Sequence, residues 1–384
     1  MPFYNNIYIP EQTETNEPQK EIKIAGFDFD DTLCIRRVTK KRPCMGWEGK
    51  IFDTLQELSN NGYTIVIFSN QGSIAHKKKA DVEKCIQKIQ ERFTSFIDSM
   101  KHLSMYCLYA PAYDICRKPA LGMLKKLESS LYPTTIDYSK SFFVGDAAGR
   151  KGDFSCTDRM FAINANMSFK TPEHLFLGTP EPTNYHIPIY NIPHVSTDEE
   201  FIEKTNLQKI LDMFHNDIEN NIPIAVASIG FPGSGKTYLF QFLRKYLKKK
   251  YPKLNVSNVS KDMNGRDFEY VLKRMCLKCN VVLIDNTHPT REDRNKIRNS
   301  CDTNIHKSLR QRHMYFIEMD TTREQSEYLN RVRSLKTGTM ISPIVYNIYN
   351  KKKVPYTQSS NEVYFRVPIV LLGTENDPDF QLLL

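Results

Sequence analysis

Two aspartates, Asp28 and Asp30, stand two residues apart directly after a short apolar run. If a strand ends there, both carboxylates can reach one phosphoryl group. Asp28 would then attack phosphorus and form an aspartyl-phosphate. Asp30 would protonate the leaving oxygen and afterwards deprotonate the hydrolytic water. The segment Phe27–Leu33 therefore predicts a phosphoryl-transfer site with a nucleophilic carboxylate, although two aspartates at this spacing are also common in ordinary loops.

Three residues far along the chain support that prediction. Ser69 follows a second apolar run, and its hydroxyl group could hold the phosphoryl oxygens, while Lys118 supplies a cation for the developing charge. Asp146 follows a third run and provides a carboxylate for Mg²⁺ beside Asp28 and Asp30, because Mg²⁺ prefers hard oxygen ligands. The predicted metal ligands in this half are therefore Asp28, Asp30 and Asp146.

Two further aspartates, Asp153 and Asp158, follow within a dozen residues of Asp146. Each could support the predicted metal site. Each could equally be a surface residue or a helix cap, and the sequence leaves both readings open.

A glycine-rich segment in the second half matches the pattern G-x-x-x-x-G-K-[ST] in full, between a strand-like run and a helical run. Glycines let the backbone curl so that several N–H groups point at phosphate oxygens, and the N-terminus of the following helix adds positive potential. The lysine is expected to reach the β- and γ-phosphates of a nucleotide, and the threonine to ligate Mg²⁺. The predicted nucleotide-binding residues are Gly230, Gly233, Ser234, Gly235, Lys236 and Thr237.

Charged residues around this loop bear on what receives the phosphoryl group. Asp262 falls where the next strand should end, so its carboxylate could take the proton of an attacking hydroxyl; the alternative is a helix cap. Asp285 ends a later strand and could contact Mg²⁺ through water or position the acceptor. Arg323, Arg331 and Arg333 could neutralise the transferring phosphoryl group, or could simply form a solvated helix face.

Strand-like runs alternate with helical periodicity in both halves of the chain. Strands are predicted over 22–28, 63–68, 105–110 and 141–145, with helices over 51–58 and 82–96. Further strands are predicted over 222–229, 281–284 and 314–317, with a helix after the glycine-rich segment. This alternation predicts an α/β fold in which parallel sheets are flanked by helices.

Four prolines crowd between residues 178 and 194, where no periodicity is present, and this composition is typical of a linker. We therefore expect an irregular arm over 1–20, a first domain over 21–177, a linker over 178–204 and a second domain over 205–384. Two domains also suit a chain of 384 residues.

The composition is that of a globular protein, with 40% apolar and 25% charged residues. No run approaches the roughly 18 apolar residues that span a membrane, and no secretory signal is evident. Nine scattered cysteines favour reduced thiols and an intracellular location. The net charge of +9 permits a polyanionic partner without proving one. A monomer is the expected state.

The ordered set Asp28, Asp30, Ser69, Lys118 and Asp146 resembles the haloacid dehalogenase superfamily of phosphotransferases. Only 38 residues lie between Asp30 and Ser69, and a helix takes part of them. The resemblance then implies a site without a cap domain, which can admit the end of a polymer.

The two halves together resemble the polynucleotide kinase 3′-phosphatase family from about residue 22 to about 372. The resemblance is carried by Ala25–Asp28, Ile67–Gln71, Arg117–Pro119, Phe143–Arg150, Asp153–Arg159, Gly230–Lys236 and Ile284–Thr287. It implies a Rossmann-like 3′-phosphatase that depends on Mg²⁺ and a P-loop kinase that uses ATP on 5′-hydroxyl ends. It also implies DNA ends rather than RNA ends, and a nuclear rather than a cytoplasmic location.

The chain departs from that family pattern in several places. About 21 residues precede the first strand, too few for the phosphopeptide-binding domain of the animal enzyme, so docking by that route is not expected. Asp31 replaces the glycine usual after the second aspartate, and Lys261 stands where arginine is common. These differences bear on fine geometry more than on the chemistry.

Other interpretations stay open at this point. The same chemistry could act on RNA ends, or on small metabolites. A non-catalytic nucleic-acid-binding scaffold is the third possibility, but the intact acidic residues and Lys236 count against it. A basic loop after the first aspartates could grip backbone phosphates, serve in nuclear import or merely be solvated. Its residues are Arg36, Arg37, Lys40, Lys41 and Arg42.

Overall fold

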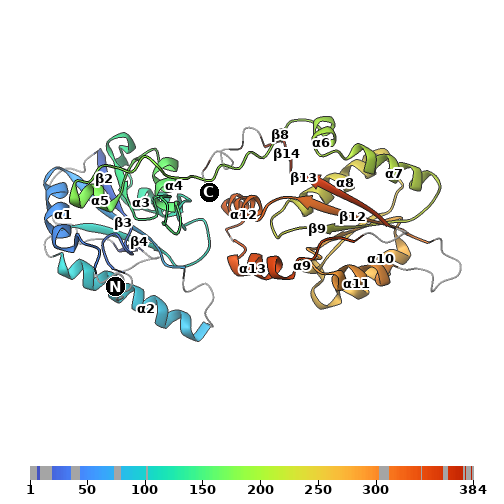
Figure 1. The fold of residues 1–384 in the computed structure, drawn as a ribbon, viewed down its shortest axis with the longest axis horizontal. Helices are drawn as coiled ribbons and strands as arrows, with labels where there is room; N and C mark the ends of the chain where they lie inside the picture. Colours follow the sequence, from blue (N-terminus) through green and yellow to red (C-terminus); the bar gives the residue numbers. More distant parts are fainter. Residues whose placement is uncertain are drawn as a thin grey trace. The chain divides into compact units, whose positions relative to one another are not determined.

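The computed structural model describes residues 7–8, 20–35, 44–72, 79–100, 103–301, 311–338, 340–357, 362–374, 377 and 382. The chain divides into two compact units (Figure 1). The first comprises 1–189 with 332–340 and 378–384, and the second comprises 190–331 and 341–377. Residues 178–193 form no helix or strand, and all of them are described. The domain boundaries given above remain predictions.

The first unit is built on a sheet whose strands follow the order β1-β4-β3-β2-β6-β7, with β5 beside β2. The pairs are parallel except β1 with β4. The strands are β1 (Ile7–Tyr8), β2 (Glu21–Phe27), β3 (Tyr63–Asn70), β4 (Met105–Ala110), β5 (Thr135–Ile136), β6 (Phe142–Val144) and β7 (Ser168–Lys170). Because β2 lies between β3 and β6, the segments that follow these three strands meet at one edge.

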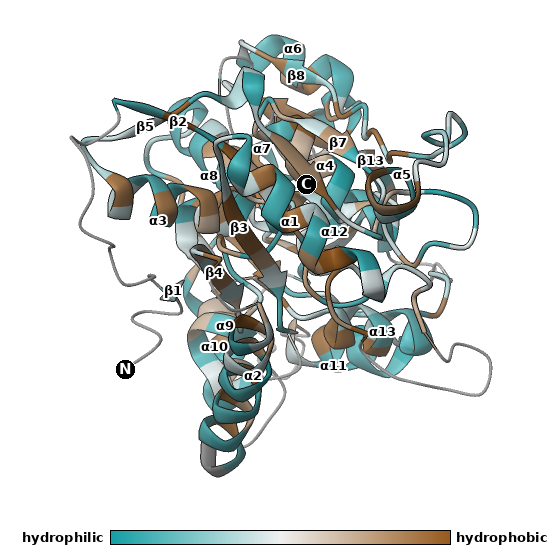
Figure 2. Cartoon of the chain, turned by 90° about the vertical axis from the view of Figure 1, so that its left-hand side faces the viewer, coloured by the Kyte–Doolittle hydropathy of each residue, from teal (hydrophilic) through white to brown (hydrophobic). Residues whose placement is uncertain are grey.

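Helices cover both faces of this sheet. One face packs against α1 (Ile51–Asn60), α2 (Lys79–Ser99) and α5 (Pro172–Leu177), with Leu55, Phe93 and Phe176 in the shared core. The other packs against α3 (Gly122–Leu131) and α4 (Thr157–Asn164), with Leu127 and Phe161 in a second core. Figure 2 shows β3 and β4 in brown between helices with teal outer faces. The apolar runs of β2, β3, β4 and β6 are therefore buried from both sides, as parallel sheets require.

The second unit contains a parallel sheet in the order β10-β11-β9-β12-β13. Its strands are β9 (Ile224–Ile229), β10 (Val256–Ser260), β11 (Val281–Asp285), β12 (His313–Asp320) and β13 (Glu362–Pro368). A short parallel pair joins β8 (His194–Val195) to β14 (Leu371–Leu372). The helices are α6 (Asp198–Lys204), α7 (Gln208–Glu219), α8 (Lys236–Lys250), α9 (Lys261–Asn264), α10 (Phe268–Lys278), α11 (Arg291–Cys301), α12 (Arg323–Thr337) and α13 (Pro343–Lys352). Of α12, residues 323–331 belong to this unit, and the residues from 332 onward belong to the first unit.

The second sheet is also covered on both faces. Leu272 of α10 and Ile297 of α11 belong to one core, together with Ile284 of β11 and Phe316 of β12. On the other side, α8 contacts β10 and β11, and α7 contacts β9. The predicted α/β class with helix-flanked parallel sheets is therefore confirmed. In the part of the chain that the structure describes, no helix is both long and apolar enough to cross a membrane.

Six strands were not predicted from the sequence: β1, β5, β7, β8, β13 and β14. The clearest cases are β7 and β13. Each lies at an edge of its sheet, and both contain charged residues, so neither shows the continuous apolar run of a central strand. β13 places Glu362 beside Met314 of β12 and Arg366 beside Glu318. This segment therefore forms a strand because it pairs with β12, and its own composition does not indicate a strand.

A tight turn follows the two aspartates of the first unit. Asp31 has a φ of 64°, in the left-handed region, and its backbone N–H donates to the Cys34 carbonyl at 2.7 Å. Aspartate enters this region more readily than most residues with a Cβ atom. The turn explains why glycine is usual at this position and how aspartate replaces it.

The turn predicts a specific order of stabilities. Asp31→Gly and Asp31→Asn should leave the urea unfolding transition of the first unit close to that of the wild type, because both residues accept positive φ. Asp31→Val should lower the free energy of unfolding by about 1 kcal/mol, because a β-branched residue is strained there. Equal stability of the valine and asparagine variants would show that the turn does not impose this conformation.

Candidate active sites

The first candidate site lies beyond the carboxyl ends of β2, β3 and β6. Asp28 directly follows β2, and its backbone N–H donates to the Val144 carbonyl of β6 at 2.8 Å. Ser69 lies in β3, and Asp146 comes two residues after β6 ends. The carboxyl ends of parallel strands are where α/β proteins usually hold ligands. The sheet thus brings three of the predicted residues to a common edge.

A buried lysine joins this edge from the loop after β4. Lys118 is 2% exposed, and its Nζ atom lies 2.6 Å from Oδ1 of Asp28 and 2.8 Å from Oδ1 of Asp158. Asn70, at the end of β3, accepts a hydrogen bond from the Lys118 N–H at 2.9 Å and donates to its carbonyl at 3.1 Å. The lysine backbone is therefore held from both sides. Burial lowers the pKa of Lys118, but Asp158 and Asp28 more than offset it and raise the pKa overall.

Three carboxylates surround that lysine. Asp28, Asp146 and Asp158 each offer an oxygen atom, and these atoms lie within 4.8 Å of one another. Burial is the main cause that raises the pKa of Asp28 to about 7; Lys118 opposes the rise and Asp158 adds to it. Burial and the neighbouring Asp28 raise the pKa of Asp146 to about 8.

This donor set fits a divalent cation. When all are ionised, the three carboxylates carry three negative charges and Lys118 carries one positive charge, which leaves an excess of two. Oxygen ligands of this kind suit Mg²⁺. Gly145 makes room for the cluster, because a Cβ atom there would lie 2.3 Å from an oxygen of Asp158.

The structure does not bring Asp30, predicted as a metal ligand, into this cluster. Its Oδ1 atom accepts from Arg92 Nη2 at 2.5 Å, and its Oδ2 atom accepts from Gln71 Nε2 at 2.6 Å. Gln71 Nε2 also lies 2.8 Å from Oγ of Ser69. Two hydrogen-bond donors thus turn the Asp30 side chain toward Ser69 and α2, and Asp158 takes the place expected of Asp30.

The structure places Asp158 and Asp153 in different surroundings. Asp158 is 2% exposed and lies in the carboxylate cluster, where its Oδ2 atom also accepts from the Ala147 N–H at 3.1 Å. Asp153 instead accepts from the backbone N–H groups of Ala148 and Arg150 at 3.1 and 3.0 Å, and pairs with the Arg150 guanidinium. Asp153 therefore shapes the loop that carries Asp146.

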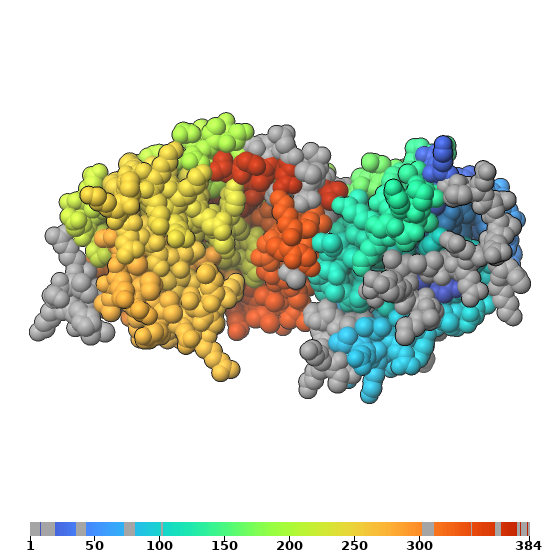
Figure 3. Space-filling model, turned by 180° about the vertical axis from the view of Figure 1, so that it is seen from behind, coloured from blue at the N-terminus to red at the C-terminus, as the bar shows by residue number. Residues whose placement is uncertain are grey.

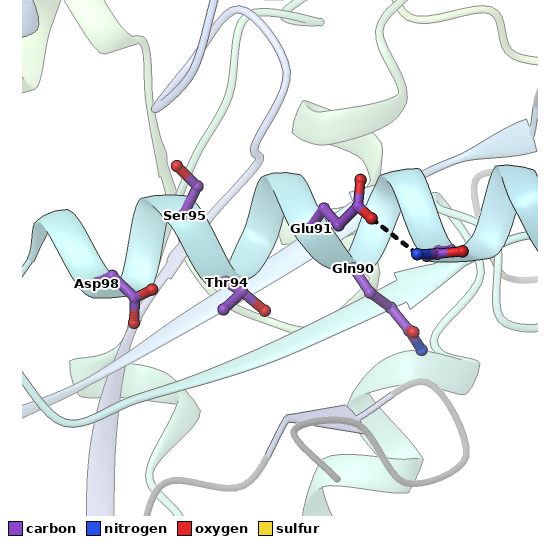
Figure 4. Close-up of a pocket in the computed structure, with 6 residues that line it drawn as sticks. Gln90, Glu91, Thr94, Ser95 and Asp98 are labelled. Carbon is purple, nitrogen blue, oxygen red and sulfur yellow. Dashed lines mark hydrogen bonds between the residues drawn. The ribbon is translucent and has the colours of Figure 1, made fainter.

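A hollow on α2 is separate from this cluster. Figure 4 shows its polar lining and a hydrogen bond from Gln87 Nε2 to Glu91 Oε1, which is 2.9 Å long. The lining residues are Gln87, Gln90, Glu91, Thr94, Ser95 and Asp98. None of the predicted site residues lines it, so we do not regard it as an active site.

The second candidate site is the glycine-rich loop between β9 and α8. Gly230, Gly233 and Gly235 have φ values of 151°, 76° and 87°. A Cβ atom on Gly233 would lie 2.7 Å from the Ser326 carbonyl oxygen, and one on Gly235 would lie 2.4 Å from the Ile369 side chain. Both conformation and space therefore require glycine at 233 and 235.

Lys236, Thr237 and Asp285 meet at this loop. Lys236 is the first residue of α8, and its buried Nζ atom lies 3.2 Å from the Gly230 carbonyl and 3.2 Å from Ser234 Oγ. Asp285 ends β11; burial raises its pKa, while a hydrogen bond with Thr237 and the charge of Lys236 oppose the rise. This set could hold a nucleotide phosphate and its Mg²⁺, with Thr237 and Asp285 as oxygen ligands.

Asp262 is exposed in the first turn of α9, the helix directly after β10. The cap of that helix is Ser260, whose Oγ atom accepts from the Met263 N–H at 3.2 Å. The alternative that Asp262 caps the helix is therefore not what the structure shows. Its carboxylate acts on Asp285 through charge, which is consistent with a position near the glycine-rich loop.

The three predicted arginines all belong to α12. Arg323 begins the helix and pairs with Glu327 at 2.7 Å, whereas Arg331 is half-buried and Arg333 is exposed. Ser326 of the same helix approaches the glycine-rich loop, as noted for Gly233. The helix is thus adjacent to the loop, and roles for these arginines remain predictions.

Sequence reasoning missed His288, which ties β11 to the start of the glycine-rich loop. Its Nδ1 atom donates to the Ser228 carbonyl at 2.7 Å, and the Gly230 N–H donates to the Thr287 carbonyl at 3.2 Å. His288 is 2% exposed with a φ of 40°, and burial lowers its pKa to about 4. Only its place directly after Asp285–Thr287 could have signalled this contact.

The other missed residues lie around Asp30. Gln71 stands two residues after Ser69, within a segment that carried the family resemblance, so a signal was present. Arg92 lies in the apolar stripe of α2, and nothing in its neighbours distinguished it. The basic loop from Arg36 to Arg42 falls outside the described residues.

Comparison with known proteins places these two sites in a family. Residues 23–176 match the family model of polynucleotide kinase 3 phosphatase. A protein of Acanthamoeba polyphaga mimivirus described as a bifunctional polynucleotide phosphatase/kinase is 32% identical over 362 residues, which cover 87% of this chain and 81% of the relative.

Two cellular relatives match over shorter lengths. The bifunctional polynucleotide phosphatase/kinase of Schizosaccharomyces pombe is 30% identical over 293 residues, which cover 72% of this chain and 63% of the relative. The polynucleotide 3′-phosphatase ZDP of Arabidopsis thaliana is 34% identical over 191 residues, which cover 46% of this chain and 26% of the relative. Since the viral relative matches over most of both chains, the chain belongs to the family of bifunctional polynucleotide phosphatase/kinases.

Proposed function

We propose that this chain heals nucleic-acid ends, removing 3′-phosphates with its first unit and phosphorylating 5′-hydroxyl groups with its second. The observation that carries the proposal is the presence of two phosphate-handling sites in one chain. One is the carboxylate cluster around Lys118, and the other is the glycine-rich loop with Lys236. Family membership over most of the chain supports both activities and the polynucleotide substrate.

In the phosphatase reaction, Asp28 is the nucleophile. Its carboxylate oxygen forms a bond to phosphorus as the bond from phosphorus to the 3′-oxygen breaks, and Asp30 gives its proton to that oxygen. Water then attacks phosphorus, Asp30 takes its proton, and phosphate leaves Asp28 free again. Lys118 would neutralise and Ser69 would hold the phosphoryl oxygens.

Asp28, Asp146 and Asp158 would hold Mg²⁺ at this site. A bound Mg²⁺ would neutralise charge on the phosphoryl group and keep the carboxylates ionised. The raised pKa values of Asp28 and Asp146 support this, because burial, and after it the neighbouring carboxylates, oppose ionisation where no cation is bound.

In the kinase reaction, the backbone of the glycine-rich loop and Lys236 would bind the phosphates of ATP, with Thr237 and Asp285 beside its Mg²⁺. Asp262 takes the proton of the 5′-hydroxyl group as its oxygen bonds to the γ-phosphorus, and ADP leaves. Arg323, Arg331 and Arg333 are the candidates to neutralise the transferring group.

DNA ends are the favoured substrate, and RNA ends are the second candidate. The net charge of +9 suits either polyanion. A monomer that acts in the nucleus fits the proposal best. Initial rates on DNA and RNA oligonucleotides of identical sequence and end chemistry separate the two substrates, and a faster rate on RNA at both sites would reassign the substrate.

The two-site proposal predicts that the activities can be removed one at a time. Asp28→Asn should lower release of phosphate from a 3′-phosphorylated oligonucleotide by at least about a thousandfold, because it removes the nucleophile. Lys236→Ala should lower transfer of labelled phosphate from ATP to a 5′-hydroxyl end by a similar factor. Each variant serves as the folding control for the other, because the untouched activity should persist. Loss of both activities in either variant would contradict the assignment.

The carboxylate cluster predicts a pH-dependent stabilisation by Mg²⁺. Without Mg²⁺, Asp28 and Asp146 keep their protons up to about pH 7 and 8 in the folded state but lose them near pH 4 when unfolded. The stability that these groups contribute is therefore complete below pH 4 and is lost as the pH rises toward 8.

Mg²⁺ favours the ionised carboxylates, so its stabilising effect should grow between pH 6 and pH 8 by about 1.4 kcal/mol per pH unit for each proton displaced. Urea unfolding of the full chain with EDTA or with Mg²⁺ measures this effect. Asp146→Asn should flatten the dependence. A Mg²⁺ effect that is the same at pH 6 and pH 8 in the wild type would overturn the assignment of these carboxylates.

A further inference from the structure

We propose that Arg92 is a positioning residue for the 3′-phosphatase reaction, which holds the Asp30 carboxyl group in the orientation that protonates the leaving 3′-oxygen. This inference rests on the proposed function. Its basis is the geometry around Asp30, where both carboxyl oxygens accept hydrogen bonds from side chains on other elements.

The contact between Arg92 and Asp30 is short and partly shielded from water. Arg92 Nη2 lies 2.5 Å from Oδ1 of Asp30, and the two side chains are 36% and 18% exposed. The residues are 62 positions apart in the chain. Such a contact persists only if α2 is held firmly against the turn that carries Asp30.

Packing between aromatic rings holds α2 against this turn. The Phe29 ring, which precedes Asp30, lies 4.3 Å from the ring of Phe93 and 5.5 Å from that of Phe96, measured between centroids. The Arg92 guanidinium lies 5.2 Å from the centre of the Phe29 ring. The three rings therefore hold α2 beside the segment 28–30, and the position of Arg92 follows from theirs.

A second donor fixes the other oxygen of the same carboxyl group. Gln71 is 6% exposed, and its Nε2 atom bridges Oδ2 of Asp30 and Oγ of Ser69. With Arg92 on Oδ1 and Gln71 on Oδ2, rotation of the Asp30 carboxyl group costs at least one hydrogen bond. A fixed acid is effective because the proton must travel along one direction as the bond from phosphorus to oxygen breaks.

The arrangement also accommodates the charge that the proton transfer leaves on Asp30. When Asp30 gives its proton to the 3′-oxygen, its carboxyl group becomes negatively charged. The guanidinium of Arg92 is already in place to bind that charge, so no rearrangement is needed at that moment. Arg92 acts through Asp30 and touches no reacting atom.

The inference predicts an effect that depends on the leaving group. A 3′-phosphorylated oligonucleotide releases an alkoxide-like oxygen that needs a proton, whereas 4-nitrophenyl phosphate releases a phenolate that does not. Arg92→Ala should lower kcat on the oligonucleotide by about 10- to 100-fold with little change in KM, since general acid catalysis contributes at least this much. The rate on 4-nitrophenyl phosphate should change by less than about threefold. Arg92→Lys should recover part of the loss.

Lys88→Ala is the matched control. Lys88 is exposed one turn earlier on α2, whose surface is visible in Figure 3, so its loss removes the same charge from the same helix. It should leave both rates unchanged. If Arg92→Ala and Lys88→Ala both raise KM for the oligonucleotide and leave kcat intact, Arg92 is a nucleic-acid contact and the inference is wrong. Equal losses on both substrates in Arg92→Ala would identify a merely structural role and would also overturn it.

Asp30→Asn separates this inference from the proposed function. If Asp30→Asn shows the leaving-group dependence and Arg92→Ala does not, the role of Asp30 stands and that of Arg92 falls. If Asp30→Asn shows no such dependence, Asp30 is not the acid and both claims fail. A wild-type chain that releases no phosphate from 3′-ends would overturn the proposed function first.

Discussion

The first candidate site depends on the ion pairs that the buried ammonium group of Lys118 forms with Asp28 and Asp158. An unpaired charge in the interior costs several kcal/mol, so Lys118 requires the carboxylates of Asp28 and Asp158 at 2.6 and 2.8 Å. Asp146 crowds those carboxylates, so the group would carry two negative charges in excess if all three were ionised. Without a divalent cation, protons on Asp28 and Asp146 offset that excess. The chemistry proposed for Asp28 follows from this imbalance.

The surrounding structure holds these charged groups close together. The carboxyl ends of β2, β3 and β6 bring their loops together, Asn70 holds the lysine backbone, and the missing side chain of Gly145 admits Asp158. Asp153 then binds the backbone of the loop that carries Asp146. None of these three supporting residues touches the proposed reacting atoms, yet each determines where Lys118, Asp158 or Asp146 lies.

The second unit meets a different physical requirement with the same architecture. Its loop is proposed to bind phosphate through backbone N–H groups, so glycines rather than carboxylates are the constrained residues. Gly233 and Gly235 have neighbours that would collide with any side chain, and His288 joins the neighbouring strand to the start of the loop. In both units, the proposed site lies at the carboxyl ends of central parallel strands, where each loop borders two neighbours.

The sequence was informative wherever a local pattern coincided with a strand end. Asp28, Ser69, Asp146, Lys236 and Asp285 all follow or end apolar runs, and the α/β class followed from the same alternation. Asp158, Gln71 and Arg92 were harder to interpret, because their roles depend on which distant side chains the fold places beside them. The edge strands β7 and β13 were missed for the same reason: their partners, and not their own composition, define them.

We infer that the carboxylate cluster holds protons that a divalent cation must displace. Calorimetric titration of the full chain with Mg²⁺ at pH 7, in two buffers of different ionisation enthalpy, measures those protons directly. We expect a binding heat that differs between the buffers and so reports proton release, and we expect Asp146→Asn to reduce that release. Binding to the cluster with the same heat in both buffers would mean that the carboxylates are already ionised and that no protons are displaced.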